Sequence, residues 1–312
     1  MAKKALLAGI NHYDYPGLPE LRGSLNDVTN VRNILKSNLG FRNEEIRVLA
    51  DDRATKANIL YRLNWLVRGA KAEDTLVFYF AGLGSQFRLR DGDDLRDHLD
   101  EVLCAYGMNW DNGFITTEEV HDIVKKLPEG VLLEVILDAG FSDVSGVDAS
   151  GWRPEKSVQS RFLHPPVDVQ ARSEGEEDEL DATRTFSAIV RDISGAALWT
   201  GSQDQVAAEE ANMGGILSGA FTYYLCRQLR ETNGQLSRHD TLKRVRQSLR
   251  HNGFTQTSQL QSAVNLKSLK TLSLEEIEIA AATRAEIGGA ISKEAREKVA
   301  QFPGRATSMK VA

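Results

Sequence analysis

Two segments place glycines and polar residues directly after an apolar run that is typical of a buried strand. The first runs from Phe80 to Gln86 (FAGLGSQ) and the second from Leu137 to Asp143 (LDAGFSD). In open α/β sheets, ligands bind just beyond the carboxyl ends of the strands. Glycines at such ends allow the backbone to turn sharply and to approach a ligand closely. We therefore expect the chemistry of this protein at these two strand ends.

The nucleophiles that the chain offers do not form an obvious catalytic set. Ser85 and Ser142 lie at the two strand ends, but neither has a histidine beside it in the sequence. Cys226 lies within a helical pattern, and a buried free cysteine is common and inert. Cys104 lies far along the chain from the second strand end. With only these two cysteines there is no disulfide framework, which favours a reducing cytoplasm as the location.

The elements that must position these ends alternate between strands and helices. This alternation predicts a parallel sheet covered by helices and joined by right-handed crossovers. The expected strands are Lys4 to Ile10, Ile46 to Leu49, Leu76 to Phe80, Val131 to Leu137 and Ala196 to Thr200. Apolar residues at helical spacing predict helices near 28–39, 59–67, 116–127, 215–232 and 237–252. Gly40 is expected to cap the first of these helices, and Thr116 with Glu119 forms a capping box for the third.

The pattern of apolar residues breaks down between Gly151 and Thr185. This stretch contains three prolines and the acidic run Glu174 to Asp181, so we expect an exposed loop between two parts of one domain. The predicted organisation is a domain over 1–270, with a first part over 1–150, a loop over 151–185 and a second part over 186–270. A tail over 271–312 is expected to be helical at first and then to lose order.

Composition and charge exclude several classes of function. The chain has 312 residues, of which 41% are hydrophobic and 26% charged, as in ordinary globular proteins. A formal net charge of −6 disfavours nucleic acid as the main partner, because phosphate binding needs a basic surface. No apolar run approaches the roughly 20 residues that cross a bilayer. We therefore expect a cytoplasmic protein with no nucleic-acid or membrane partner.

Several motifs resemble those of the caspase-like cysteine peptidases of family C14. The segments LLAGIN at 6–11, LRGSLND at 21–27 and ATKANI at 54–59 resemble the start of the bacterial metacaspases, or orthocaspases. FYFAGLGSQ at 78–86 is similar to the family segment with the catalytic histidine, and EVILDAGFS at 134–142 to the strand with the nucleophilic cysteine. The resemblance covers roughly residues 4 to 262. It implies a caspase-like (caspase-hemoglobinase) fold, an α/β architecture with a mostly parallel sheet between two layers of helices.

The catalytic dyad of that family is replaced in this chain. Aligned on the two motifs, the histidine position is Leu83 and the cysteine position is Gly140. Cysteine peptidases need a thiolate that attacks the carbonyl and an imidazole that protonates the leaving amine. Leucine cannot transfer a proton and glycine has no side chain. We therefore predict a pseudo-peptidase with no catalytic residues at these positions.

The resemblance also implies a pocket for a basic side chain. Metacaspases cut after arginine or lysine because carboxylates converge on that residue, and the corresponding acids here are Asp27 and Asp138. Two further pocket positions are Ser24 and Ala81, and Asp204 could extend the same wall. Paired carboxylates suit the two-pronged guanidinium of arginine. The alternative interpretation is that Asp27 only complements the helix dipole and that Asp138 serves folding.

Calcium is a cofactor of many metacaspases, but it is disfavoured here. The acidic stretch from Asp91 to Glu101 offers oxygen ligands of the kind that calcium takes. However, the family run Ile-x-Asp-Asp-Glu is Ile115 to Glu119 (ITTEE) in this chain, which loses an expected ligand. We therefore predict no cofactor and no metal site.

Three functions remain open at this stage. The first is a pseudo-peptidase that binds a protein or peptide with exposed arginine or lysine, as a monomer or weak oligomer. The second is an active endopeptidase that cuts after arginine or lysine through a relocated nucleophile, with Cys104, Cys226 and His12 as candidates. The third is a structural or regulatory subunit of an active relative that uses the tail after Thr271. Leu83 and Phe141 could also fill the cleft and leave the acids without a ligand.

Overall fold

A six-stranded sheet forms the centre of the chain, and the two strand ends lie on its middle strands. The computed structural model describes residues 1–91, 94–95, 99–142, 152–153, 158–171, 184–202 and 206–273. The strand order is β15 (Gln259–Ser262), β12 (Ala196–Thr200), β9 (Leu132–Asp138), β3 (Thr75–Ala81), β1 (Lys3–Gly9) and β2 (Ile46–Ala50). The five predicted strands are all present and parallel to one another, while β15 pairs antiparallel with β12.

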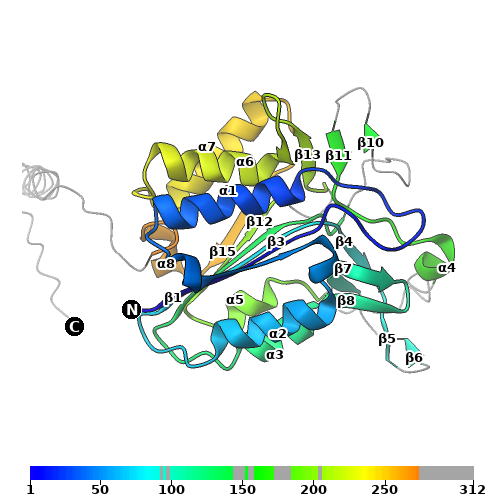
Figure 1. Ribbon diagram of the computed structural model, residues 1–312, viewed down its shortest axis with the longest axis horizontal. Helices are drawn as coiled ribbons and strands as arrows, with labels where there is room; N and C mark the ends of the chain where they lie inside the picture. Colours follow the sequence, from blue (N-terminus) through cyan, green and yellow to red (C-terminus); the bar gives the residue numbers. More distant parts are fainter. Residues whose placement is uncertain are drawn as a thin grey trace, which may run out of the picture. The chain divides into compact units, whose positions relative to one another are not determined.

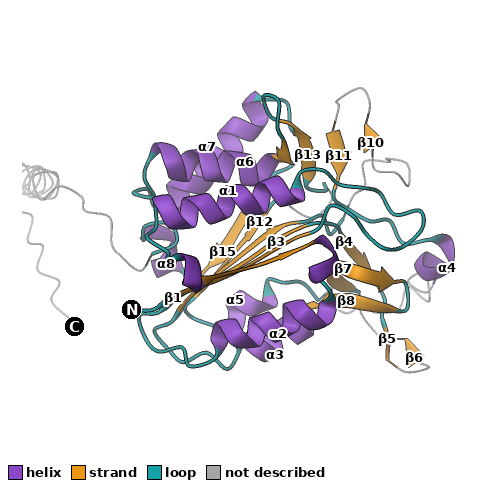
Figure 2. Ribbon diagram, viewed as in Figure 1, coloured by secondary structure: helices purple, strands orange, loops and turns teal. Residues whose placement is uncertain are grey.

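Helices cover both faces of this sheet, as Figures 1 and 2 show. One face carries α1 (Ser24–Ser37), α6 (Ala220–Glu231) and α7 (Arg238–His251), and the other carries α2 (Lys56–Val67), α3 (Thr117–Val124) and α5 (Ala188–Asp192). Strands β3 and β9 are buried along their whole length, which explains their nearly continuous apolar sequence. The predicted three-layer α/β architecture is confirmed.

Local capping signals fix the ends of three helices. The Thr116 side chain accepts a hydrogen bond from the Glu119 N–H, and the Glu119 carboxylate accepts one from the Thr116 N–H, as the capping box predicted. Thr55 caps α2 in the same way through the Asn58 N–H. Gly40 has a φ of +69° just beyond α1, a conformation that glycine adopts at little cost.

Short antiparallel strands, which the sequence did not predict, flank the ends of β3 and β9. One sheet contains β4 (Gly84–Phe87), β7 (Asp100–Asn109) and β8 (Asn112–Thr116), and another contains β10 (Trp152–Arg153), β11 (Val158–Ser160), β13 (Glu209–Asn212) and β14 (Leu217–Gly219). The expected helix over 215–232 was therefore wrong at its start. It begins at Ala220, because Leu217–Gly219 pairs with β13.

Smaller elements complete the described chain. They are the 3-10 turns Asn43–Glu45 (η1) and Asp51–Arg53 (η2), the hairpin β5 (Arg90–Asp91) and β6 (Asp94–Leu95), and the helices α4 (Val167–Gln170) and α8 (Val264–Ser268). No helix among the described residues is long and apolar enough to cross a membrane.

The expectation of an exposed loop over 151–185 was wrong for its central part. Val158–Ser160 forms the strand β11, and Arg161, Phe162 and Leu163 after it are buried. The acidic run at 174–181 lies outside the described residues, and so does the tail beyond residue 273 to which we assigned a partner contact.

Candidate functional site

The two predicted strand ends meet, as their positions in the sheet require. Strands β3 and β9 pair in parallel with Ala81 opposite Asp138, so Leu83 and Gly140 both lie just beyond the carboxyl edge of the sheet. The two following loops pack so closely that a Cβ atom on Gly84 would collide with the carbonyl oxygen of Gly140. Glycine at position 84 is therefore required for this contact.

A segment of the same chain lies across these strand ends. Strand β11 pairs antiparallel with β13, and the pairing continues beyond it, since the Arg161 N–H donates to the Ala208 carbonyl at 2.8 Å. On its other side the segment contacts the first loop, where the Leu163 N–H donates to the Gly84 carbonyl at 2.8 Å. An extended peptide is thus held on both sides over residues 158–163, which we call the cleft segment.

The carbonyl oxygen of Arg161 accepts two backbone hydrogen bonds from the strand-end loops. The Gly84 N–H donates to it at 2.9 Å and the Gly140 N–H at 3.1 Å. Two backbone N–H groups that converge on one carbonyl oxygen have the arrangement of an oxyanion hole, which in acyl transfer stabilises the negative charge that develops there. The Arg161–Phe162 peptide bond therefore lies where the bond to be cut would lie in a peptidase of this geometry.

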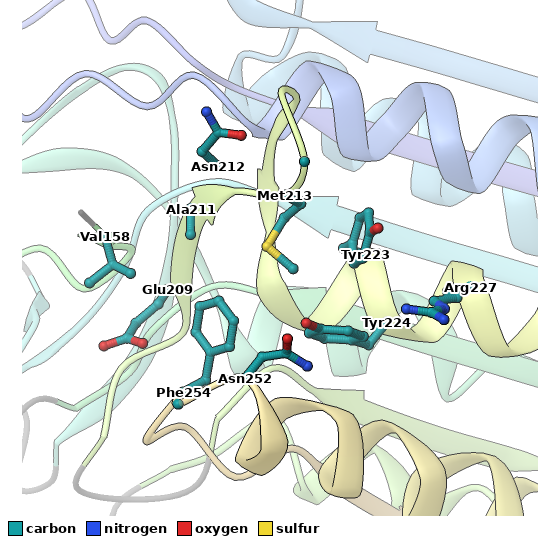
Figure 3. A pocket seen from close by; sticks show the side chains of 12 residues that line it. Val158, Glu209, Ala211, Asn212, Met213, Tyr223, Tyr224, Arg227, Asn252 and Phe254 are labelled. Atoms are coloured by element: carbon teal, nitrogen blue, oxygen red, sulfur yellow. The ribbon is translucent and has the colours of Figure 1, made fainter. Parts of the chain in front are cut away.

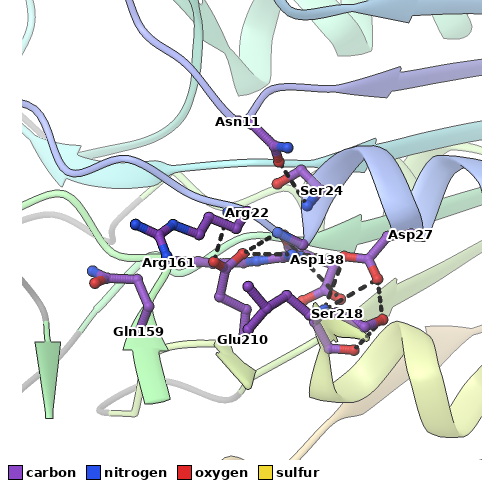
Figure 4. A network of polar contacts seen from close by, with 12 residues as sticks. Asn11, Arg22, Ser24, Asp27, Asp138, Gln159, Arg161, Glu210 and Ser218 are labelled. Carbon is purple, nitrogen blue, oxygen red and sulfur yellow. Dashed lines mark hydrogen bonds and ion pairs between the residues drawn. The ribbon is translucent and has the colours of Figure 1, made fainter. Parts of the chain in front are cut away.

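The Arg161 side chain is completely buried among three carboxylates (Figure 4). Its Nη2 atom lies 2.6 Å from Oδ2 of Asp27 and 3.2 Å from Oε2 of Glu210. Its Nη1 atom lies 3.2 Å from Oδ2 of Asp138 and donates to the Asp138 carbonyl at 3.1 Å. Helix α1, strand β9 and strand β13 each contribute one of the acids, so the pocket exists only in the folded domain.

Charge in this pocket is not balanced by Arg161 alone. Burial by itself lowers the pKa of Arg161, but Asp138, Asp27 and Glu210 together raise it well above its usual value. Burial raises the pKa of Asp27 to about 7, against the opposing attraction of Arg161. The nearby Asp138 carboxylate adds to the rise in the pKa of Asp27, so this carboxyl group holds a proton more readily than an isolated aspartate would.

Neighbouring groups hold the two aspartates in place. The Ser218 hydroxyl and the Gly219 N–H both donate to Asp27, the latter at 3.0 Å. The Thr222 N–H and hydroxyl both donate to Oδ2 of Asp138, at 3.1 and 2.6 Å. Both acids thus have fixed orientations, which favours recognition of a planar guanidinium.

Two glycines make room for the cleft segment. A Cβ atom on Gly219 would lie 2.5 Å from Nη1 of Arg161, and one on Gly140 would lie 2.9 Å from the Phe162 nitrogen. The missing side chain at position 140 therefore allows this close approach, and a Cβ atom there would require a small shift of the cleft segment.

Comparison with known proteins identifies the family. The family model described as "Metacaspase, peptidase C14 domain" matches residues 3–148. Metacaspase-1A of Aspergillus niger is 32% identical over 296 residues, which cover 86% of this chain and 72% of that protein. The chain belongs to the metacaspase family. Metacaspase-1 of Eremothecium gossypii is 42% identical over 148 residues, but these span only 32% of that protein's length and 45% of this chain.

Solved structures support the caspase-like fold of this metacaspase. A crystal structure of a Geobacter sulfurreducens protein matches with a TM-score of 0.60 at 17% identity and covers 88% of this chain and 100% of that one. Caspase-1 of Spodoptera frugiperda matches with a TM-score of 0.52 at 13% identity, over 83% of this chain and 86% of that one. The predicted family and the predicted fold are both confirmed.

Of the other three residues predicted for the pocket of this metacaspase, the structure describes Ser24 and Ala81. Ser24 is the first residue of α1 and is buried, and its N–H donates to Oδ1 of Asn11 at 2.9 Å. Its hydroxyl has no hydrogen-bond partner within the described part of the chain. Ala81 ends β3 opposite Asp138, and Asp204 lies outside the described residues.

Leu83 and Phe141 do not take the place of a ligand in the cleft. Leu83 is fully buried in a cluster with Cys104 and Leu163, and the Leu83 N–H donates to the Tyr13 hydroxyl at 2.7 Å. The Phe141 ring packs against Phe186, with the centroids 5.4 Å apart. The cleft segment, and not these two side chains, fills the space beside the acids.

Both cysteines are buried, and neither is placed to act as a nucleophile. Cys104 and Cys226 expose 0% and 2% of their surface, and burial raises the pKa of each thiol far above its usual value. At neutral pH both are therefore protonated thiols, which are poor nucleophiles. His12 is exposed and its Nδ1 lies 3.7 Å from the Glu20 carboxylate.

Sequence reasoning missed Arg161 and Glu210, which complete the pocket. Arg161 was overlooked because it lies in the proline-containing stretch expected to be a loop. The signal that was available is the short apolar pattern Val158, Phe162 and Leu163 around a single arginine. Glu210 follows Glu209 in a strand that was not predicted. Without that strand, the sequence offered no reason to expect the Glu210 side chain to point into the cleft.

An open pocket lies beside the start of the cleft segment (Figure 3). Its volume is about 390 Å³, and Val158, Ala211 and Tyr224 are among its lining residues. Val158 is opposite Ala211 in the pairing of β11 with β13, so this pocket adjoins the segment three residues before Arg161.

Much of the acidic stretch near residues 91–101, including Asp93 and Asp97, lies outside the described residues. Among the residues that the structure describes, no group of three or more histidine, cysteine, aspartate or glutamate side chains is placed to hold a metal ion. At the expected calcium motif, the Glu119 carboxylate caps α3 and lies 2.7 Å from Nζ of Lys56. Its ligand capacity is thus already used by protein groups.

Proposed function

We propose that this metacaspase homologue does not cut peptide bonds and that its cleft recognises an arginine side chain. The observation that carries the proposal is the placement of Arg161. Its carbonyl oxygen accepts the N–H groups of Gly84 and Gly140, while its guanidinium contacts Asp27, Asp138 and Glu210. The cleft thus binds both the main chain and the side chain of Arg161, as it would bind an arginine residue of a peptide ligand.

Absence of cleavage follows from the residues at the two strand ends. Leu83 has no group that could protonate a leaving amine, and Gly140 has no side chain that could attack the Arg161 carbonyl. The buried thiols of Cys104 and Cys226 offer no substitute.

A partner with an exposed arginine or lysine would have to replace the cleft segment. Both chains would use the same contacts: pairing along β13, the two backbone N–H groups and the three acids. Because the cleft segment is tethered, its effective concentration is high and it competes strongly with a free peptide. We therefore propose that access to the pocket is controlled by release of residues 158–163.

Hydrolysis of fluorogenic peptides that end in arginine or lysine tests the proposal, with and without calcium. The native chain should be silent under both conditions. A Leu83→His/Gly140→Cys/Arg161→Ala variant, with the dyad restored and the cleft segment weakened, should cut after basic residues. Cleavage by the native chain would overturn the absence of catalysis, and a silent but folded triple variant would overturn the assignment of the strand ends.

The same variant with Arg161 retained provides a second readout. A restored cysteine would attack the Arg161 carbonyl carbon to form a thioester and release the Phe162 amine, which takes a proton from the restored histidine; water then hydrolyses the thioester. Intact-mass spectrometry should therefore detect fragments that end at Arg161 and begin at Phe162. Cleavage at another bond would contradict the placement of Arg161 in the cleft.

A further inference from the structure

A second surface, far from the cleft in the fold, gathers positive charge in a chain whose net charge is −6. It is a groove of about 560 Å³ over the C-terminal half of α2. Its cations are Arg47, Arg62, Arg68 and Lys126, and no carboxylate lines it. We call it the α2 groove. In Figure 1, α2 lies with α3 on the face of the sheet opposite α1, α6 and α7.

The cations of the α2 groove have no acidic partner among the residues that the structure describes. Within the part of the chain that the structure describes, no ion pair involves any of the four. Arg47 donates only to the carbonyls of Glu44 and Ile46, at 2.8 and 3.2 Å. The usual role of a cation at a helix end is filled by Lys4, which donates to the Trp65 and Arg68 carbonyls.

Aromatic side chains hold some of these cations in position. The Arg47 guanidinium carbon lies 4.9 Å from the centre of the Trp65 ring, and that of Arg62 lies 5.4 Å from the centre of the Tyr61 ring. These cation–π contacts restrain the two guanidinium groups, and Arg62 keeps N–H donors that can bind a carboxylate. Tyr61 is 67% exposed, which is unusual for a large ring on a surface helix.

Together these residues have the composition of a protein-binding surface. Arginine, tyrosine and tryptophan are the residues that most often dominate binding energy at interfaces. We propose that the α2 groove binds an acidic peptide segment of another protein. Carboxylates would pair with the guanidinium edges of Arg62 and Arg68, and an apolar side chain of the partner would cover the exposed ring of Tyr61.

Fluorescence anisotropy with the full chain tests this proposal. The probe is a fluorescein-labelled peptide of six Gly-Glu repeats, and the neutral control has six Gly-Gln repeats. We expect only the acidic peptide to bind. The affinity of an Arg62→Glu/Arg68→Glu variant for the acidic peptide should fall by roughly tenfold or more, since each charged contact contributes about threefold.

A matched control separates local recognition from net charge. Lys243 and Arg244 are exposed on α7, on the other face of the sheet, and the Lys243→Glu/Arg244→Glu variant changes the net charge equally. This variant should bind the acidic peptide within twofold of the native chain. Equal losses in the two variants would overturn the proposal, because attraction would then be nonspecific.

Two further measurements complete the test. Tyr61→Ala should weaken the binding of a peptide of Leu-Glu repeats more than that of the Gly-Glu peptide, because only the Leu-Glu peptide offers an apolar side chain to the ring. A single-stranded RNA of equal charge serves as a competitor. If RNA bound more tightly than either peptide and with the same dependence on Arg62 and Arg68, the groove would be a nucleic-acid site and the proposal would be wrong.

Discussion

Arg161 and Arg238 are both completely buried, yet they are surrounded by different groups. Arg238 begins α7 and donates to a single carboxylate, that of Glu134, with 2.7 Å between Nε and Oε1. Its remaining bonds go to main-chain carbonyls near the end of the described chain, including Lys270 at 2.9 Å and Ser273 at 3.0 Å. Arg161 instead faces three carboxylates from three separate elements.

This difference in the number of surrounding carboxylates separates the structural ion pair of Arg238 from the proposed binding site around Arg161. Arg238 and Glu134 neutralise each other, and Trp199 donates a further hydrogen bond to Glu134 at 2.7 Å. This pair joins β9, β12 and α7 to the segment at 266–273. Around Arg161 the acids exceed the cations, which costs stability unless a cation is held there. Such an excess is typical of a site for a cationic ligand, here supplied by the chain itself.

The largest effect is expected at the structural pair. Glu134→Ala leaves the Arg238 charge buried without a partner, and we expect a loss of about 3–5 kcal/mol in the free energy of unfolding. Urea denaturation measures this loss. The Glu134→Leu/Arg238→Met variant removes both charges and should recover most of it. A loss below about 1 kcal/mol in Glu134→Ala would show that the pair is not the tether described.

A pH dependence of stability is expected for the Arg161 pocket. Burial raises the pKa of Asp27 from 3.8 to about 7, so the folded chain holds a proton that the unfolded chain releases. The contribution of Asp27 to stability is therefore present below about pH 4 and lost as the pH rises toward 7, with a slope of at most about 1.4 kcal/mol per pH unit. The difference in stability between the native chain and Asp27→Asn should change across this window.

Urea denaturation of the native chain and of Asp27→Asn between pH 4 and 8 measures this change in the stability difference. If Asp27→Asn and the native chain kept a constant difference across the window, the carboxyl group would not titrate as its surroundings predict.

A smaller effect is expected where glycine makes room for Arg161. Gly219→Ala would place a methyl group against Oδ2 of Asp138 and 2.5 Å from Nη1 of Arg161, and the displacement should cost about 1–3 kcal/mol. In an Arg161→Ala background only the clash with Asp138 remains, and that carboxylate is no longer held by the guanidinium, so part of the cost should disappear. A double-mutant cycle by urea denaturation measures this coupling. Additive effects would mean that Gly219 does not shape space for the arginine.

Much of the fold could be predicted from the sequence because its signals are local. Continuous apolar runs marked the buried strands, and the capping box at Thr116 and Glu119 marked the start of α3. The short antiparallel strands were missed because they lack such signals. β11 and β13, for example, are three and four residues long and contain polar side chains. Their pairing joins residues about 50 positions apart, which no local pattern reveals.

The candidate site was predictable only in part for the same reason. Asp27 and Asp138 were found through family motifs, and both contact Arg161. Arg161 and Glu210 could not be found, since their role depends on how a proline-containing stretch folds back over the sheet. The burial of an arginine is determined by long-range contacts and not by its neighbours in the chain.

Binding of an arginine peptide to an Arg161→Ala variant tests the central claim most directly. The peptide acetyl-Val-Gln-Ser-Arg-amide repeats residues 158–161, and acetyl-Val-Gln-Ser-Gln-amide is its control. By isothermal titration calorimetry, we predict that the arginine peptide binds the Arg161→Ala variant at least tenfold more tightly than the native chain, whose cleft is occupied. The control peptide should bind neither. Equal affinity of the arginine peptide for both proteins, or none for a folded Arg161→Ala variant, would contradict the claim that Arg161 occupies a site for an arginine ligand.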